Sequence, residues 1–193
     1  MTLVLSILVC SSLLPALTAA GTVYTRWGNK GCGSTTATVY SGYVGGSVYT
    51  APGSGGNYLC LPTNPVPTNV SRPAYVSSLY GTEYEVSNRK ENNFDALCAV
   101  CFVSTRSVNI MIPGTNKCPA GWTSEYTGLL MSGYDGHAGS TEFICVDSIM
   151  EGRNNSSANQ NGRLLYLVAG IYGSLPCPPY VNNNILQCVV CSK

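Results

Sequence analysis

The chain has 193 residues, a formal net charge of +1 at pH 7 and only 10% charged residues. Because it has no basic stripe and no acidic block, nucleic acid is not expected as a partner and a disordered charged tail is not indicated. The 21 glycines, 11 prolines and 13 tyrosines, without a convincing helix-period stretch beyond the N-terminus, predict an all-β extracellular module.

Residues 1–20 have the features of a secretory signal peptide. Residues 3–14 form an apolar run that is too short for a comfortable membrane span. Small residues follow, with Thr18 and Ala20 at positions −3 and −1 before Gly21. A membrane anchor is the alternative, but no basic stop-transfer residues follow the run. We therefore expect a secreted chain without a membrane span, which retains nine of the ten cysteines after Cys10 is removed.

The first half of the mature chain predicts short strands separated by glycine-rich turns. Residues 23–27 alternate and predict a strand that ends at Gly28. A second strand is expected over 36–40, turned at Ser41–Gly42, with residues 44–50 as its hairpin partner. The loop at 51–56 is rich in glycine, but no Lys-Ser/Thr and no helix follow it, so a phosphate site is not predicted.

Several polar residues of the chain are candidates for surface positions or for chemistry. Asn69, Asn154 and Asn155 begin glycosylation sequons, which in a secreted chain indicate surface loops. Glu83 and Glu85 lie on one face of an alternating strand and invite comparison with a glycosidase acid pair. A solvated strand face is the more common explanation of such a pair, and we adopt it here.

The second half predicts strands over 109–112, 127–132 and 164–168, and a last strand that ends the chain. The loop at 133–139 holds His137, which is the single histidine of the sequence. A catalytic histidine needs a nucleophile and an orienting acid, and apart from Asp135 two residues away nothing in the sequence supplies them. We expect no catalytic residue, no metal site and no cofactor, and interpret the chain as non-enzymatic.

The cysteines indicate an internal duplication. The order Cys, Cys, Cys-x-x-Cys occurs twice, and the first two cysteines are 28 residues apart in one copy and 27 in the other. A Tyr-x-Gly motif, at 40–42 and 126–128, starts eight residues after the first cysteine of each copy. The sequence therefore predicts two tandem homologous β subdomains, 21–103 and 104–193, with a pseudo-twofold relation. The repeated cysteines are Cys32, Cys60, Cys98 and Cys101, then Cys118, Cys145, Cys188 and Cys191.

The chemistry of these cysteines has three possible interpretations. The two Cys-x-x-Cys pairs could supply four zinc thiolates or a thioredoxin-type redox motif. A secreted chain favours disulfides instead, and neither pair has the strand–helix context of a thioredoxin. Spacing alone does not fix the connectivity, although a duplication requires the same pattern in each half. Cys177 is left over as an unpaired thiol.

At residues 98–122 the sequence resembles the C-terminal noncollagenous domain of type IV collagens, a tandem duplication with a closing Cys-x-Val-Cys in each half and Cys-Pro-x-Gly-Trp opening the second. It is more similar to the related domain of spongin-type short-chain collagens. The resemblance covers nearly the whole mature chain. Further residues on which the resemblance rests are 26–28, 40–43, 57–60, 80–81, 143–147, 173–180 and 188–191.

The resemblance implies an all-β fold, a matrix location and self-association into a homo-oligomer. It also implies a cysteine where Tyr172 stands, as a partner for Cys177. No Gly-X-Y run is present, so the chain cannot itself build a collagen rod. The nested disulfides implied by the resemblance are Cys32–Cys101, Cys60–Cys98, Cys118–Cys191 and Cys145–Cys188.

We therefore expect a secreted structural or interaction module of extracellular matrix or mucus, whose partners are matrix proteins or glycans. The alternative is a lectin-like recognition or defence protein, because tyrosines, tryptophans and loop asparagines can stack on sugars and hydrogen-bond to them. A secreted hydrolase is the third possibility, and the sequence gives it no triad, metal cluster or acid pair.

Overall fold

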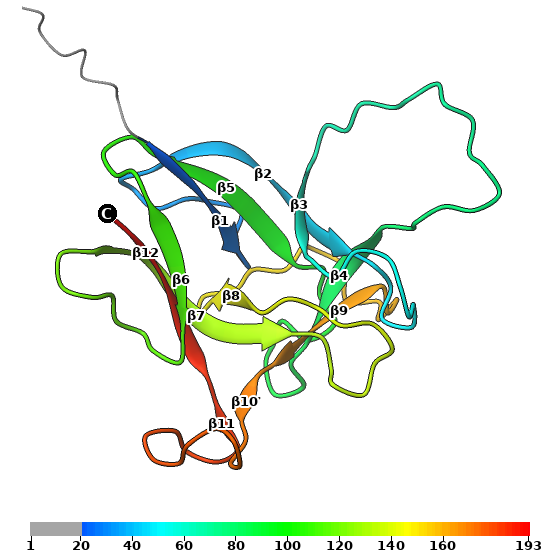
Figure 1. Ribbon diagram of the computed structural model, residues 1–193. Helices are drawn as coiled ribbons and strands as arrows, with labels where there is room; N and C mark the ends of the chain where they lie inside the picture. Colours follow the sequence, from blue (N-terminus) through cyan, green and yellow to red (C-terminus); the bar gives the residue numbers. More distant parts are fainter. Residues whose placement is uncertain (1–20) are drawn as a thin grey trace, which may run out of the picture.

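The computed structural model describes residues 21–193, and the predicted signal peptide, 1–20, lies outside this part. Every regular element of the described residues is a β-strand, so the all-β class is confirmed (Figure 1). The strands are β1 (Thr22–Trp27), β2 (Ala37–Gly46), β3 (Leu59–Pro62), β4 (Tyr80–Glu85), β5 (Leu97–Val103), β6 (Asn109–Pro113), β7 (Thr123–Ser132), β8 (Ile144–Asp147), β9 (Arg163–Leu167), β10 (Ala169–Gly170), β11 (Asn184–Ile185) and β12 (Gln187–Ser192).

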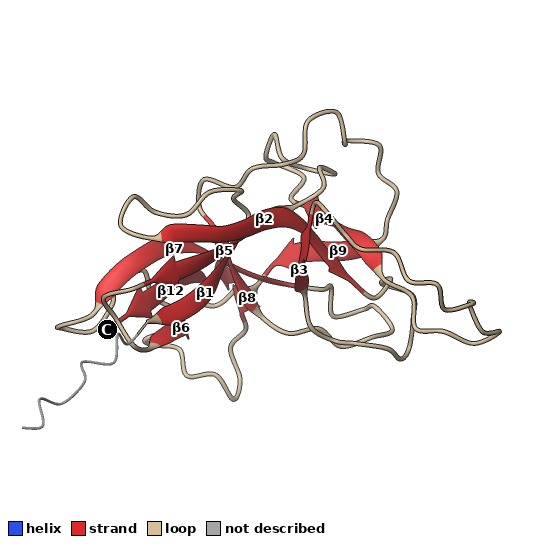
Figure 2. Cartoon of the chain, turned by 90° about the horizontal axis from the view of Figure 1, so that it is seen from above, coloured by secondary structure: helices blue, strands red, loops and turns tan. Residues whose placement is uncertain are grey.

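Strands from both halves of the sequence belong to one sheet. Its order is β6-β12-β7-β8-β1-β5-β2-β4-β9, with β3 paired to β2, while β10 and β11 form a separate ladder. The pairing closes on itself because β9 also pairs with β7, through Met131 opposite Leu167 and Ser132 opposite Tyr166. Figure 2 shows the strands gathered in the middle of the molecule and the loops arranged around them.

The two halves repeat the same strand pairings. β5 lies between β1 and β2 in the first half, and β12 lies between β6 and β7 in the second, with every pair antiparallel. β3 pairs with β2 as β8 pairs with β7. Both long strands carry a register shift at the same place, which skips Val39 in β2 and Glu125 in β7. The internal repeat therefore extends to strand register, while the pseudo-twofold relation stays a prediction.

The repeated Tyr-x-Gly motif has one structural role in both halves. The Tyr40 hydroxyl donates to the carbonyl oxygen of Cys60 at 3.0 Å, and the Tyr126 hydroxyl lies 2.8 Å from that of Cys145. A Cβ on Gly42 would lie 1.7 Å from the Leu61 carbonyl oxygen, and one on the equivalent Gly128 would lie 2.0 Å from that of Val146. The glycine thus lets the next strand approach the backbone closely.

The turn expected at Ser41–Gly42 is wrong, because β2 continues through both residues to Gly46. Gly42 has no left-handed backbone angle, and its lack of a side chain serves the contact with β3 instead. Of the expected partner at 44–50, residues 44–46 are instead the end of β2, which pairs with β3 and β4, and residues 47–50 lie in the loop that follows.

Gly42→Ala should lower the free energy of unfolding by about 3 kcal/mol, at the upper end of the usual cost of overpacking, since both colliding groups are backbone atoms. Gly81→Ala is the matched control in another strand, because a Cβ there meets nothing within 4 Å. Urea unfolding of both variants provides the measurement. Equal stabilities would show that β2 and β3 separate freely at Gly42.

The halves meet through strand pairs and through a shared core. β1 pairs with β8 in parallel at Trp27 and Val146, and β4 pairs in parallel with β9. The buried side chains form two clusters, and each cluster contains residues of both halves. Tyr84, Val44, Met131 and Leu165 belong to one cluster, and Tyr24, Tyr126 and Leu130 belong to the other.

Candidate functional site

Four disulfides tie the strands of each half together. Cys101 and Cys98 on β5 hold the earlier part of the first half, and Cys191 and Cys188 on β12 do the same in the second. The outer bridges enclose 69 and 73 residues, and the inner ones 38 and 43. These are the four pairs that the resemblance implies: Cys32–Cys101, Cys60–Cys98, Cys118–Cys191 and Cys145–Cys188.

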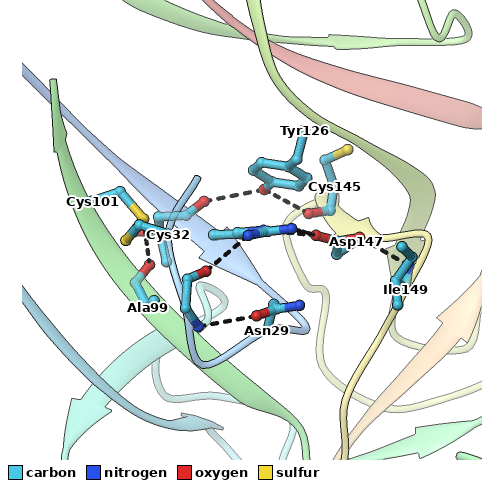
Figure 3. Close-up of polar contacts among 11 residues, drawn as sticks. Asn29, Cys32, Ala99, Cys101, Tyr126, Cys145, Asp147 and Ile149 are labelled. Atoms are coloured by element: carbon cyan, nitrogen blue, oxygen red, sulfur yellow. Dashed lines mark hydrogen bonds and ion pairs between the residues drawn. A yellow bond between two sulfur atoms is a disulfide. The ribbon is translucent and has the colours of Figure 1, made fainter. Parts of the chain in front are cut away.

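A buried ion pair joins the two halves. Arg26 on β1 donates from Nε to Asp147 Oδ2 on β8 at 2.7 Å, and its Nη2 lies 2.6 Å from the same oxygen. The other oxygen of Asp147 accepts the backbone N–H of Ile149 at 2.9 Å, and the ring of Tyr126 lies beside the pair (Figure 3). The Asp147 side chain is 4% exposed, so its charge is compensated almost entirely by protein groups.

This ion pair has no counterpart elsewhere in the repeat. Ile112 on β6 occupies the register position of Arg26, and Pro62 on β3 occupies that of Asp147. The pair therefore belongs to the contact between the halves and not to the strand pairings that the halves share.

The predicted glycosylation sites all lie on the surface. Asn69 is exposed in the long loop between β3 and β4, and Asn154 and Asn155 are exposed in the loop that precedes β9. The Ser156 hydroxyl of these overlapping sequons is buried, where it donates to the Arg153 carbonyl and accepts the Asp95 N–H.

The loop at 63–79 projects from the body of the molecule (Figure 1). All of its residues are exposed, including Tyr75 at 95% and Val66 at 92%. Both ends are fixed, because β3 carries the Cys60–Cys98 disulfide and β4 pairs with β2 and β9. A contact between the hydroxyls of Ser77 and Ser54 ties the loop to its neighbour. Apolar side chains are thus presented to solvent on an anchored loop.

The solvated-face interpretation of Glu83 and Glu85 is wrong for Glu83. Its side chain is 3% exposed and accepts the backbone N–H groups of Gln160 and Asn161 at 2.9 and 3.1 Å. Glu85 is half-buried, and burial, followed by the neighbouring charge of Glu83, raises its pKa. Glu83 holds the loop before β9 in place.

His137 lies in a group of aromatic side chains at a cavity, a surrounding that its position in the predicted loop did not indicate. Its ring centroid is 4.7 Å from that of Tyr49, 5.3 Å from that of Tyr134 and 5.7 Å from that of Tyr166. Burial lowers the pKa of His137 and raises that of Tyr166. Tyr49 belongs to the loop after β2, whereas the other three residues come from the second half.

The cavity beside His137 has a volume of about 580 Å³, within the usual range for small-molecule sites. Its walls come from residues 132–143, at and after the end of β7, and from residues 166–171 along β9 and β10. The Ser132 hydroxyl bonds to that of Thr141 at 2.6 Å, and the Gly133 N–H donates to the Thr141 hydroxyl at 2.7 Å. These bonds within the loop fix the wall.

A second cavity of about 550 Å³ has charged walls. Lys90 and Glu91 of the wall pair with each other at 3.8 Å. Arg153 of the wall pairs at 2.6 Å with Asp95, which is not a wall residue. Its charges are therefore partly matched within the protein, and Asn154 of the sequon lies at its edge. Within residues 21–193, no group of three or more histidine, cysteine or acidic side chains is placed to hold a metal ion.

Cys177 is free and half-buried in the loop between β10 and β11. In denaturant, the monomer should therefore react with one equivalent of a thiol reagent per chain, and Cys177→Ser should react with none. A non-reducing gel shows in addition whether the exposed part of this thiol forms a covalent dimer. Absence of a reactive thiol in the unfolded monomer would require a different pairing of the cysteines.

Comparison with models of known protein families gives no match. Among the described residues there is also no helix of the length and apolar character that a membrane span requires.

Proposed function

We propose that the chain is a secreted, non-enzymatic interaction module of the extracellular matrix or mucus, built like the noncollagenous domains that its sequence resembles. The single observation that carries this proposal is the anchored loop at 63–79, which presents apolar side chains to solvent. Exposed apolar groups on a fixed loop are typical of surfaces that contact another macromolecule.

The scaffold supports the same function. Four disulfides are typical of proteins that work in oxidising extracellular surroundings. One of them ties β3 at the start of the loop, and strand pairing holds β4 at its end, so the loop can bind without ordering the rest of the chain. The preformed scaffold reduces the entropy lost when a partner binds.

The experiment is a binding assay of the purified secreted chain against collagens, mucins and glycosaminoglycans on a solid phase. The test variant replaces residues 64–78 by a short Gly-Ser linker, and the control replaces Tyr172, exposed in another loop, by Ala. We expect at least one matrix component to bind, with a tenfold or greater loss of affinity in the loop variant alone. Equal binding by all three proteins, or no binding, would contradict the proposal.

A further inference from the structure

We infer that the cavity beside His137 is a binding site for neutral carbohydrate. The first observation is the presence of aromatic rings that remain accessible at its walls. Tyr134 and Phe143 are 53% and 57% exposed, and Tyr166, which contacts Tyr134 at 5.6 Å between ring centroids, is half-buried. Sugar rings have an apolar face of C–H groups, and a partly exposed aromatic ring of fixed orientation is a suitable surface for it.

The arrangement of the rings distinguishes this site from a cage for organic cations. A cage for a quaternary ammonium group needs an empty space surrounded by aromatic faces. Here His137 fills the space between Tyr49, Tyr134 and Tyr166, at centroid distances of 4.7 to 5.7 Å. The cluster therefore offers an outer surface on which a flat ligand stacks, and no interior for a cation.

The charges at the cavity select against acidic ligands. Asp135 is the only charged side chain among the described residues that form its walls, and no lysine or arginine is among them. Burial lowers the pKa of His137 below its ordinary value. The imidazole is therefore mostly uncharged at neutral pH and supplies no compensating positive charge. Sialylated or sulfated sugars would meet the Asp135 carboxylate without a cationic partner.

The polar groups of the cavity fall into two sets. Ser132, Gly133 and Thr141 bond to one another and keep the wall rigid. Tyr134 and Asp135 are exposed at the cavity and Tyr166 is half-buried there, so the Asp135 carboxylate and the tyrosine hydroxyls are open to a ligand. A carboxylate accepts hydrogen bonds from two hydroxyls, which is the pattern that neighbouring sugar hydroxyls offer. The site thus combines stacking with acceptor groups for a polyol.

This inference concerns a different surface from the loop at 63–79 and does not depend on matrix binding by that loop. It assigns residues to the lectin-like alternative, in which Tyr134 and Phe143 stack on the sugar and Asp135 accepts its hydroxyls. The two ideas can fail separately, because their test variants share no residue.

The test titrates the purified full chain with lactose, mannotriose and chitotriose as neutral probes, and with sialyllactose and a sulfated chondroitin disaccharide as acidic ones. Calorimetry measures affinity, and amide NMR shifts locate the site. We expect at least one neutral probe to bind and to shift the amides of residues 132–143. Tyr134→Ala should weaken that binding at least tenfold, while Tyr172→Ala, a change of an exposed tyrosine outside the cavity, should leave it unchanged.

Tyr134 also packs against His137, so Tyr134→Ala could disturb the fold. Asp135→Asn provides the second variant, because Asp135 is exposed and its replacement has nearly the same shape. It should weaken neutral-sugar binding about tenfold without changing the thermal midpoint. Binding of none of the neutral probes, binding of acidic probes alone, or affinities unchanged in both variants would each overturn the assignment.

Discussion

Asp147→Ala should lower the free energy of unfolding by about 3 to 5 kcal/mol, the range observed when one partner of a buried ion pair is removed. The cost arises because Arg26 would keep its charge in a place where its side chain is only 18% exposed. The N–H of Ile149 would also lose its acceptor. Urea unfolding followed by tryptophan fluorescence measures the change.

The matched control is Asp95→Ala, which removes an ion pair with Arg153 whose side chains are 48% and 26% exposed. Exposed pairs contribute little, so this change should cost less than about 1 kcal/mol. Adding Arg26→Met to Asp147→Ala should recover part of the lost stability, because it removes the uncompensated charge. A loss no larger than that of the control would mean that the ion pair does not hold the halves together.

The features that the sequence predicted well are those with local or repeated signals. Alternation predicted β1, the strands expected over 127–132 and 164–168 correspond to much of β7 and β9, and the recurring order of cysteines indicated the repeat. The offset between the two Tyr-x-Gly motifs aligns the halves in the register that the strands adopt, including the skipped residues Val39 and Glu125. Repeated signals help prediction because the pattern in one half supports the same interpretation of the other half.

The features that were missed depend on contacts between distant segments. Gly42 resembles a turn residue in its local sequence, and the reason for it is the carbonyl of Leu61 on another strand. Glu83 alternates like a solvent-facing residue, yet its partners are N–H groups at positions 160 and 161. No periodic pattern within one strand contains this information.

The aromatic cavity escaped prediction for the same reason. In the local sequence around His137, Asp135 is the one candidate for a catalytic partner. The actual neighbours of His137 include Tyr49, from the other half of the chain. The Tyr49 N–H donates to the Gly162 carbonyl oxygen at 3.1 Å. The neighbouring Arg163, a buried residue of β9, donates to the carbonyl oxygens of Ser47 and Gly56 at 3.2 and 2.9 Å. Aromatic neighbours from distant segments leave no local pattern in the sequence around His137.

The inner disulfides set the other large expected effect. Replacing Cys60 and Cys98 by Ala should lower the free energy of unfolding by about 4 kcal/mol, since the bridge closes a loop of 38 residues in the unfolded chain. The same change at Cys145 and Cys188, which close 43 residues, should cost about the same. Cys177→Ser is the control, because it alters a cysteine that forms no bridge.

The outer pair should cost about as much as the inner one, although Cys32 and Cys101 are 69 residues apart. While the Cys60–Cys98 bridge remains, the shortest path from Cys32 to Cys101 runs through it. This path has only the 28 residues from Cys32 to Cys60 and the three from Cys98 to Cys101. The remaining loop is then about as long as the inner one, and loop entropy changes slowly with length. Because each bridge shortens the loop that the other closes, removing both should cost more than the sum of the single removals. Additive losses measured by urea unfolding would show that the nested bridges act independently.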